Sequence, residues 1–139
     1  EHAEQAVIAA GIDDAVHVRA GEKHRRTRIK GGIASNDIAE RIDAYIVTRG
    51  PRGSLIHTRK GTLDIPPAAE RRITDPTGCG DAYRAGLIYS LQRGMDLATA
   101  GRVASLMGAL KIEHPGTQNQ RFTYAEFADQ FRQQFGYSL

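Results

Sequence analysis

A glycine loop that runs directly into a helical segment is the feature that most constrains this sequence. The loop is Asp75-Pro-Thr-Gly-Cys-Gly-Asp81, and the residues after it, AYRAGLIYSLQRG, have the apolar spacing of a helix. Two glycines around one small residue allow the backbone to approach a ligand closely, and the first turn of a helix carries unpaired N–H groups and positive dipole. We therefore predict that this segment binds an anion.

The residues around the loop exclude two common phosphate-binding motifs. No lysine follows the second glycine, so the loop is not a Walker motif, and Tyr83 stands where G-x-G-x-x-G requires its third glycine. The N–H groups from Gly78 to Asp81 could bind a transferred phosphoryl group, while the Asp81 carboxylate accepts a proton from the attacking hydroxyl. In the structural alternative, Asp81 only caps the helix and the glycines only turn the chain.

The composition limits the other classes of function. The chain has 139 residues, of which 40% are hydrophobic and 25% charged, as is usual for a soluble domain with one core. No apolar run is long enough for a membrane span and no signal peptide is visible, so we expect a cytoplasmic protein without a membrane partner. Cys79 is the only cysteine, which excludes internal disulfides and thiolate metal sites.

The positive net charge of +3 is concentrated in one segment. Residues 17–30 contain six Lys or Arg side chains against the single acid Glu22. Such a segment attracts phosphate, including nucleic acid, but no aromatic side chain is interspersed to stack on bases. We expect a solvated loop and no nucleic-acid partner, and a nucleic-acid binder is the weakest of the alternatives.

Apolar spacing and turn residues predict an α/β chain. The expected strands are residues 14–20, 44–48, 54–58 and 62–65, and the expected helices are residues 1–10, 79–93 and 96–112. The helix over residues 1–10 is predicted because they are good helix formers followed by Gly11. Thr123 and Glu126 have the spacing of a capping box that opens a last helix. The apolar residues that recur along this helix are expected in the core: Phe127, Phe131 and Phe135.

The glycine loop resembles the C-terminal signature of the ribokinase family, the PfkB-type carbohydrate and nucleoside kinases, whose usual form is D-T-x-G-A-G-D before a helix. The earlier segment VTRGPRGS resembles the second nucleotide-side motif of the family, V-T-x-G-x-x-G. The resemblance implies a three-layer α/β/α ribokinase-like fold, of which the chain is the C-terminal nucleotide-binding portion only. Residues 1–139 would form one partial kinase domain, with the nucleotide-binding and catalytic-loop portion at 40–139 and an unplaced basic segment at 13–35.

The resemblance also implies a function and a set of site residues. The activity would be the ATP-dependent transfer of the γ-phosphate to an alcohol of a small-molecule sugar or nucleoside, with Mg²⁺ required and an adenosine-like acceptor favoured. Asp81 would be the catalytic base. The anion hole would consist of Gly78, Cys79 and Gly80, and the nucleotide-binding residues would be Thr48, Arg49, Gly50, Gly53, Ala104 and Gly108. In the structural alternatives, Gly50 and Gly53 serve only the hairpin turn, and Ala104 and Gly108 serve only close helix packing.

A monovalent cation site is implied beside the loop. Asp75 and Thr77 match positions that hold such an ion, K⁺, in many members of the family, and Gly116 would be a third contributor. The turn chemistry of Asp-Pro and Pro-Thr-Gly offers a structural alternative, in which Asp75 only caps the turn. The sequence leaves both possibilities open.

Several features depart from the family pattern. Members of the family are considerably longer, and their N-terminal half supplies acceptor-binding residues and a β-sheet lid that are not recognisable here. The Asn-x-x-Glu motif that organises magnesium and phosphate is also missing, because Asn36 is followed by Glu40, one residue too far. The competing interpretation is therefore a truncated, non-catalytic nucleotide-binding or regulatory domain. A homodimer is compatible with either interpretation.

Overall fold

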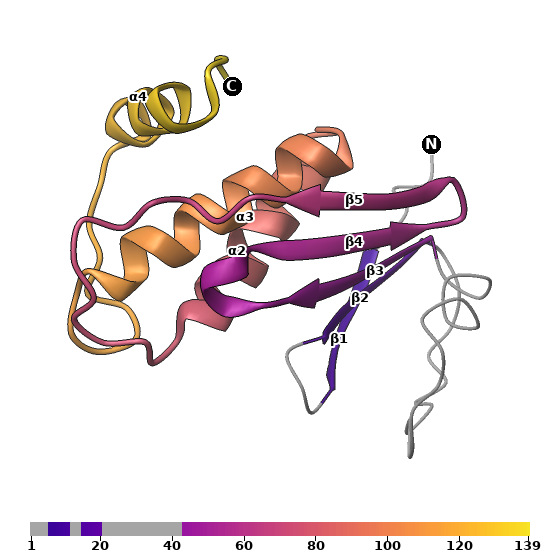
Figure 1. Cartoon of the computed structure of the whole chain (residues 1–139), viewed down its shortest axis with the longest axis horizontal. Helices are drawn as coiled ribbons and strands as arrows, with labels where there is room; N and C mark the ends of the chain where they lie inside the picture. The colour runs from indigo at the N-terminus through magenta and orange to yellow at the C-terminus, as the bar shows by residue number, and fades with distance from the viewer. Residues whose placement is uncertain (1–5, 12–14, 21–42) are drawn as a thin grey trace. The chain divides into compact units, whose positions relative to one another are not determined.

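The computed structural model of the chain describes residues 6–11, 15–20 and 43–139 (Figure 1). These residues fall into two compact units. The first unit contains the strands up to Asp64, and the second contains Pro51–Gly53 and Ile65–Leu139. Within these described ranges, no helix combines the length and the apolar character that crossing a bilayer requires. Asn36 and Glu40 lie outside the described residues, as does much of the basic segment 13–35.

The first unit is built on a five-stranded sheet whose strands follow one another in sequence order. Its strands are β1 (Ala6–Gly11), β2 (Ala15–Ala20), β3 (Ala44–Thr48), β4 (Ser54–Thr58) and β5 (Gly61–Ile65). The pairs β1–β2, β2–β3 and β3–β4 are antiparallel. Ile46 and Ile56 face each other in the β3–β4 register, and both are fully buried, so the alternation of side chains fixes which face is apolar.

The four predicted strands are confirmed, whereas the predicted helix over residues 1–10 is wrong where the structure describes it. Residues Ala6–Gly11 form β1, paired with β2 from Ala6 opposite Ala20 to Gly11 opposite Ala15. Alanine favours a helix by only about 0.7 kcal/mol or less per residue over most other residues, and this weak preference is overridden by pairing with the neighbouring strand. The first five residues of that prediction lie outside the described part of the chain.

The second unit contains three helices, α2 (Cys79–Gln92), α3 (Leu97–Ile112) and α4 (Tyr124–Phe135). The N-terminus of α3 is capped by Asp96, whose side chain accepts hydrogen bonds from the backbone of Ala98 and Thr99. The predicted capping box at the start of α4 is confirmed, because Thr123 and Glu126 bond each other's backbone N–H.

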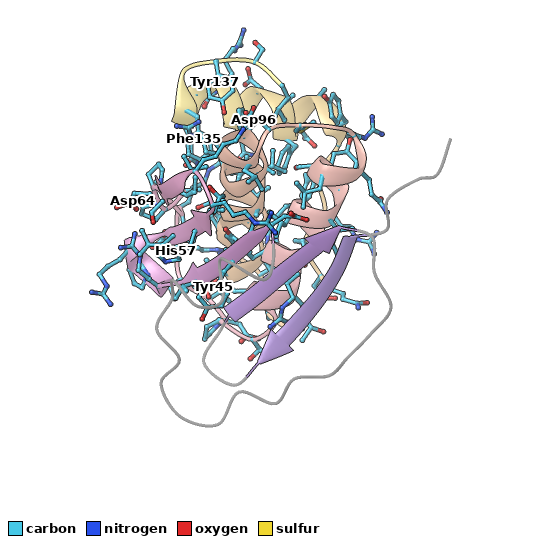
Figure 2. All side chains as sticks on the ribbon, turned by 90° about the vertical axis from the view of Figure 1, so that its right-hand side faces the viewer. Tyr45, His57, Asp64, Asp96, Phe135 and Tyr137 are labelled. Carbon is cyan, nitrogen blue, oxygen red and sulfur yellow. The ribbon has the colours of Figure 1, made fainter. Side chains whose placement is uncertain are left out.

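Aromatic side chains fasten α4 and the C-terminus in the second unit. Phe131 is fully buried, and its ring lies 4.9 Å from that of Phe135 and 5.2 Å from that of Tyr137. The Tyr137 hydroxyl lies 3.0 Å from Thr99 Oγ1, which also bonds the Asp96 carboxylate. Asp96, Phe135 and Tyr137 lie near one another in Figure 2. Phe127 and Phe131 are thus in the core as predicted, and Phe135 packs against it while half-buried.

Removal of the Phe131 ring tests this anchor. The substitution Phe131→Ala should lower the free energy of unfolding by about 3–5 kcal/mol, because it leaves a cavity beneath α4. The neighbouring exposed Arg132, whose side chain pairs with Asp129, provides the control. The substitution Arg132→Ala should change the free energy of unfolding by less than about 1 kcal/mol. Urea denaturation of the intact protein measures both. A loss below about 1 kcal/mol for Phe131→Ala would contradict the anchoring role.

Candidate functional site

The first turn of α2 has no side-chain cap. Its N-cap is Gly78, in the left-handed conformation with φ of 84°, and no side chain accepts a hydrogen bond from the turn. The starts of α3 and α4, in contrast, are capped by Asp96 and Thr123. Backbone N–H groups at the start of α2 are therefore left for another acceptor, and the helix dipole favours an anion there.

The two glycines of the loop have different structural requirements. An added Cβ at Gly78 would lie 3.2 Å from the Thr117 Cβ, and the positive φ is itself unfavourable for other residues. An added Cβ at Gly80 would meet no atom of the described residues within 4 Å. Because glycine inside a helix costs about 0.5–1 kcal/mol relative to alanine, folding alone does not explain the glycine at position 80.

Asp81 stands on the same helical turn with its carboxylate exposed. Its side chain has a relative exposure of 79%, and its Oδ1 accepts a hydrogen bond from the Arg84 Nη1 at 2.6 Å. The capping role considered as an alternative is not observed, since Asp81 is the third residue of α2 and bonds none of its N–H groups. An exposed pair at this spacing is weak, about 0.3–0.5 kcal/mol, so the Asp81 carboxylate is held only loosely by Arg84.

The loop before α2 is held by the Asp75 carboxylate. Its Oδ1 accepts from the Thr77 N–H at 2.9 Å, and its Oδ2 accepts from the Gly116 N–H at 2.8 Å. Hydrogen bonds from Thr77, then Gly116, lower the pKa of Asp75 to about 2, with a further contribution from the Lys111 charge. The structure thus brings together Asp75, Thr77 and Gly116 as predicted, and Asp75 also caps the turn as the structural alternative required. Their binding of a cation stays a prediction.

Lys111 is a site residue that sequence reasoning missed. Its side chain is fully buried, and its Nζ donates to the backbone carbonyl of Asp75 at 2.7 Å and to that of His114 at 3.1 Å. The signal that could have found it is its position, three and seven residues after Gly108 and Ala104, which places all three on one face of α3.

The end of α3 also binds the loop through its backbone. The N–H groups of Thr74 and Asp75 both donate to the Ile112 carbonyl, at 2.8 and 3.0 Å. Carbonyls in the last turn of a helix have no partner within the helix, and here one of them is satisfied by the loop. The start of the glycine loop is thereby fixed to the C-terminal end of α3.

Ala104 and Gly108 differ in their surroundings. Ala104 is fully buried, and an added Cβ at Gly86 would lie 3.0 Å from its Cα, so Ala104 serves the close packing of α2 against α3. An added Cβ at Gly108 would lie 3.7 Å from the Cys79 carbonyl oxygen, which places Gly108 beside the first turn of α2. Ala104 thus takes part in close helix packing, and the roles of Ala104 and Gly108 at a nucleotide both stay predictions.

Cys79 contributes little chemistry of its own. Burial raises the pKa of its thiol, with the charge of Lys111 opposing the rise, so the surroundings disfavour the reactive thiolate form. Its backbone N–H donates to the Pro76 carbonyl at 3.1 Å. An anion at this turn would therefore be bound first by the N–H groups of Gly80 and Asp81, for which no protein acceptor is observed in the described part of the chain.

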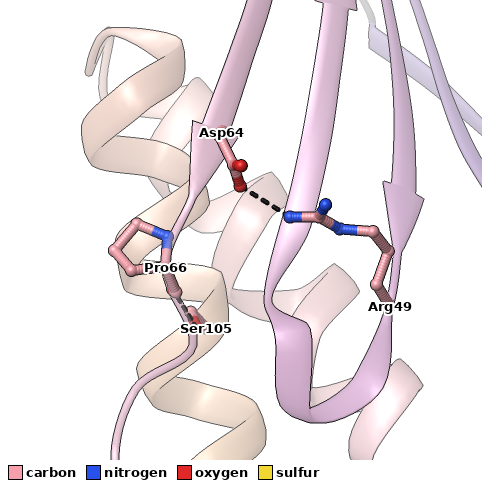
Figure 3. Close-up of polar contacts among 4 residues, drawn as sticks. All are labelled: Arg49, Asp64, Pro66 and Ser105. Atoms are coloured by element: carbon pink, nitrogen blue, oxygen red, sulfur yellow. Dashed lines mark hydrogen bonds and ion pairs between the residues drawn. The ribbon is translucent and has the colours of Figure 1, made fainter.

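The second motif of the sequence lies at the β3–β4 connection, which contains the 3₁₀ turn η1 (Gly50–Arg52). In the first unit, Arg49 leaves the end of β3 and its Nη2 lies 2.6 Å from the Asp64 Oδ1 on β5 (Figure 3). Thr48 is the last residue of β3, opposite Ser54. Gly50 has a φ of 57° and open space where its Cβ would be.

Gly53 is required by a close approach of two backbones in the second unit. An added Cβ would lie 2.1 Å from the Ile65 carbonyl oxygen, and its φ is 76°. The chain beyond Ile65 is held in turn by Ser105, whose Oγ donates to the Pro66 carbonyl at 3.1 Å and accepts from the Ala68 N–H at 2.8 Å (Figure 3). A glycine is thus needed at position 53 for folding, and Thr48, Arg49, Gly50 and Gly53 all stay predicted nucleotide-binding residues.

Comparison with known proteins relates the whole arrangement to one family. Residues 12–123 match the pfkB family carbohydrate kinase, and this range includes the segment 13–35 that sequence reasoning left unplaced. The nucleoside kinase of Methanothermobacter thermautotrophicus is 39% identical over 132 residues, which are 93% of this chain and 41% of that protein. The nucleoside kinase of Methanocaldococcus jannaschii is 37% identical over 89 residues, which are 64% of this chain and 30% of that protein. The chain thus spans well under half the length of these relatives.

Solved structures give the same result. The nucleoside kinase of Burkholderia thailandensis in complex with inosine superposes with a TM-score of 0.75 and 51% identity, over 76% of this chain and 35% of that one. The nucleoside kinase of M. jannaschii, described as an archaeal member of the ribokinase family, superposes with a TM-score of 0.70 and 33% identity, over 73% and 34% of the two chains. The predicted fold class, a part of the α/β ribokinase-like fold, is confirmed. The chain belongs to the pfkB family of carbohydrate kinases.

Proposed function

We propose that this chain supplies the phosphoryl-transfer part of a nucleoside kinase, in which the first turn of α2 binds the transferred phosphoryl group and Asp81 is the catalytic base. One observation carries the proposal. The uncapped turn, the open space at Gly80 and the exposed Asp81 carboxylate all occur within the first three residues of α2. A cradle for negative charge and a proton acceptor are the two groups that transfer to a hydroxyl requires.

The chemistry assigned to these residues is one in-line displacement. The oxygen of the acceptor hydroxyl forms a bond to the γ-phosphorus of ATP, the bond from that phosphorus to the β–γ bridging oxygen breaks, and ADP leaves with the electron pair. The hydroxyl proton passes to the Asp81 carboxylate. The N–H groups of Gly80 and Asp81 stabilise charge on the phosphoryl oxygens. Mg²⁺ bound with ATP would supply neutralisation of the phosphate charge.

A purine nucleoside is the proposed acceptor. The sequence resemblance favours an adenosine-like compound, and the B. thailandensis relative was solved with inosine. Thr48, Arg49 and Gly50 are proposed to contribute to nucleotide binding, as the family motif implies. We further propose that residues 40–139 carry nucleotide binding and the catalytic loop.

A second candidate is a nucleotide-binding domain without catalysis. It is favoured by the length of the match, since the chain spans only 30% and 41% of the two nucleoside kinases. An anion cradle and a base do not by themselves orient an acceptor hydroxyl, and orientation supplies about 7–11 kcal/mol of barrier lowering. Binding of ATP without transfer to any nucleoside would identify this second function.

Replacement of the Asp81 carboxylate tests the catalytic base. The substitution Asp81→Asn should lower kcat at least ~100-fold, because the amide cannot accept the hydroxyl proton, with little change in ATP affinity. Asp129 offers a matched control, since it forms an exposed pair with Arg132 at the same i,i+3 spacing and the same 2.6 Å distance. The substitution Asp129→Asn should leave kcat within about twofold. Steady-state kinetics of the intact protein with ATP and adenosine or inosine measure both, and near-normal turnover of Asp81→Asn would refute the assignment.

Addition of side-chain atoms at Gly80 tests the anion cradle. The substitutions Gly80→Ala and Gly80→Val should weaken ATP binding and activity together, more for Val, because their side chains fill the space assigned to the phosphoryl group. The structure predicts no clash with the described residues, so Gly80→Ala should not lower the free energy of unfolding. ATP titration by calorimetry and urea denaturation separate the two effects. Unchanged ATP affinity in both variants would place the phosphate elsewhere.

A further inference from the structure

The place beside the loop where sequence reasoning expects a potassium ion is filled by a side chain of the chain itself. The Lys111 ammonium lies within hydrogen-bond distance of two backbone carbonyls, those of Asp75 and His114, and the side chain is fully buried. Both oxygens of the Asp75 carboxylate already accept backbone N–H groups, from Thr77 and Gly116. The residues here therefore do not fit a K⁺ ion in addition to the ammonium.

Electrostatics explains why a cation is needed at this position. The Asp75 carboxylate accepts the backbone N–H groups of Thr77 and Gly116, and the carbonyl dipoles of Asp75 and His114 converge on the Lys111 Nζ. Backbone carbonyls arranged around one point are the ligands with which proteins replace the hydration shell of K⁺. A buried ammonium is in turn acceptable only when such acceptors surround it.

The same charge acts on the start of α2. The Lys111 ammonium donates to the carbonyl of Asp75 at 2.7 Å, and Asp75 lies in the loop that leads directly into α2 at Cys79. Its positive field therefore reaches the turn whose N–H groups are open, and it adds to the helix dipole in favouring an anion.

We propose that the Lys111 ammonium is a covalently attached substitute for a monovalent cation, so that the anion-binding loop holds its shape and its positive field without K⁺. Lys111 touches neither the phosphoryl group nor the acceptor in this scheme and is a positioning residue. Its effect on catalysis rests on the proposed function, whereas its effect on the loop and on stability does not.

The wild-type protein provides the first test. Its melting temperature should be the same within about 1 °C in potassium chloride and in tetramethylammonium chloride at equal ionic strength, because the cation place is filled. An increase of several degrees specific to K⁺ would overturn the proposal without any variant. The kinase rate should be equally indifferent to K⁺, and this reading alone depends on the proposed activity.

Two variants of Lys111 give the second test. The substitution Lys111→Ala removes the charge and opens space, so in tetramethylammonium its melting temperature should fall by about 5 °C or more, and K⁺ or butylammonium should restore part of the loss. The substitution Lys111→Met removes the charge but fills most of the space. Its melting temperature should therefore fall, and neither K⁺ nor butylammonium should restore it. The exposed Lys60 is the control, and Lys60→Ala should melt as the wild type does. A Lys111→Met protein as stable as the wild type, or a Lys111→Ala protein indifferent to both cations, would overturn the proposal.

Discussion

The attachment of the glycine loop to the C-terminal end of α3 is the constraint on which the rest of the candidate site depends. The loop must approach α2 from a fixed direction for Gly78 to adopt its left-handed conformation and leave the first turn uncapped. That direction is set by the Lys111 ammonium on the Asp75 carbonyl and by the Asp75 carboxylate on the Gly116 N–H. These hydrogen bonds join the loop to the end of α3 and to the residues that follow it. They thereby position the backbone N–H groups in the first turn of α2, which make few bonds within the protein.

The three helices of the second unit show how the chain separates stability from function. The starts of α3 and α4 are closed by side chains, as is usual at helix N-termini. The start of α2 gives up this stabilisation, about 1 kcal/mol for a good N-cap, and retains a glycine at position 80 that packing does not require. The aromatic core around Phe131 stabilises the same unit and offsets this loss.

Local signals predicted the parts of the structure that local physics determines. Short β-branched runs between turn residues gave the strands that contain Ile46 and Ile56, and the Thr123 capping box gave α4. The strand Ala6–Gly11 was missed because its alanines favour a helix in isolation, and only the partner strand overrides that preference. Lys111 was missed for a related reason: a lysine is ordinarily exposed, and its burial depends in part on the carbonyl of Asp75, which is distant in the sequence.

The shared acceptor at the end of α3 has a consequence for the motions of the protein. The last turns of helices ordinarily fray on their own, at almost no free-energy cost, because their carbonyls lack partners. Here the Ile112 carbonyl accepts from both Thr74 and Asp75, so the last turn of α3 cannot open without releasing the loop. Local opening at this helix end and release of the start of the glycine loop are therefore coupled, and the loop start is held for as long as the end of the helix stays closed.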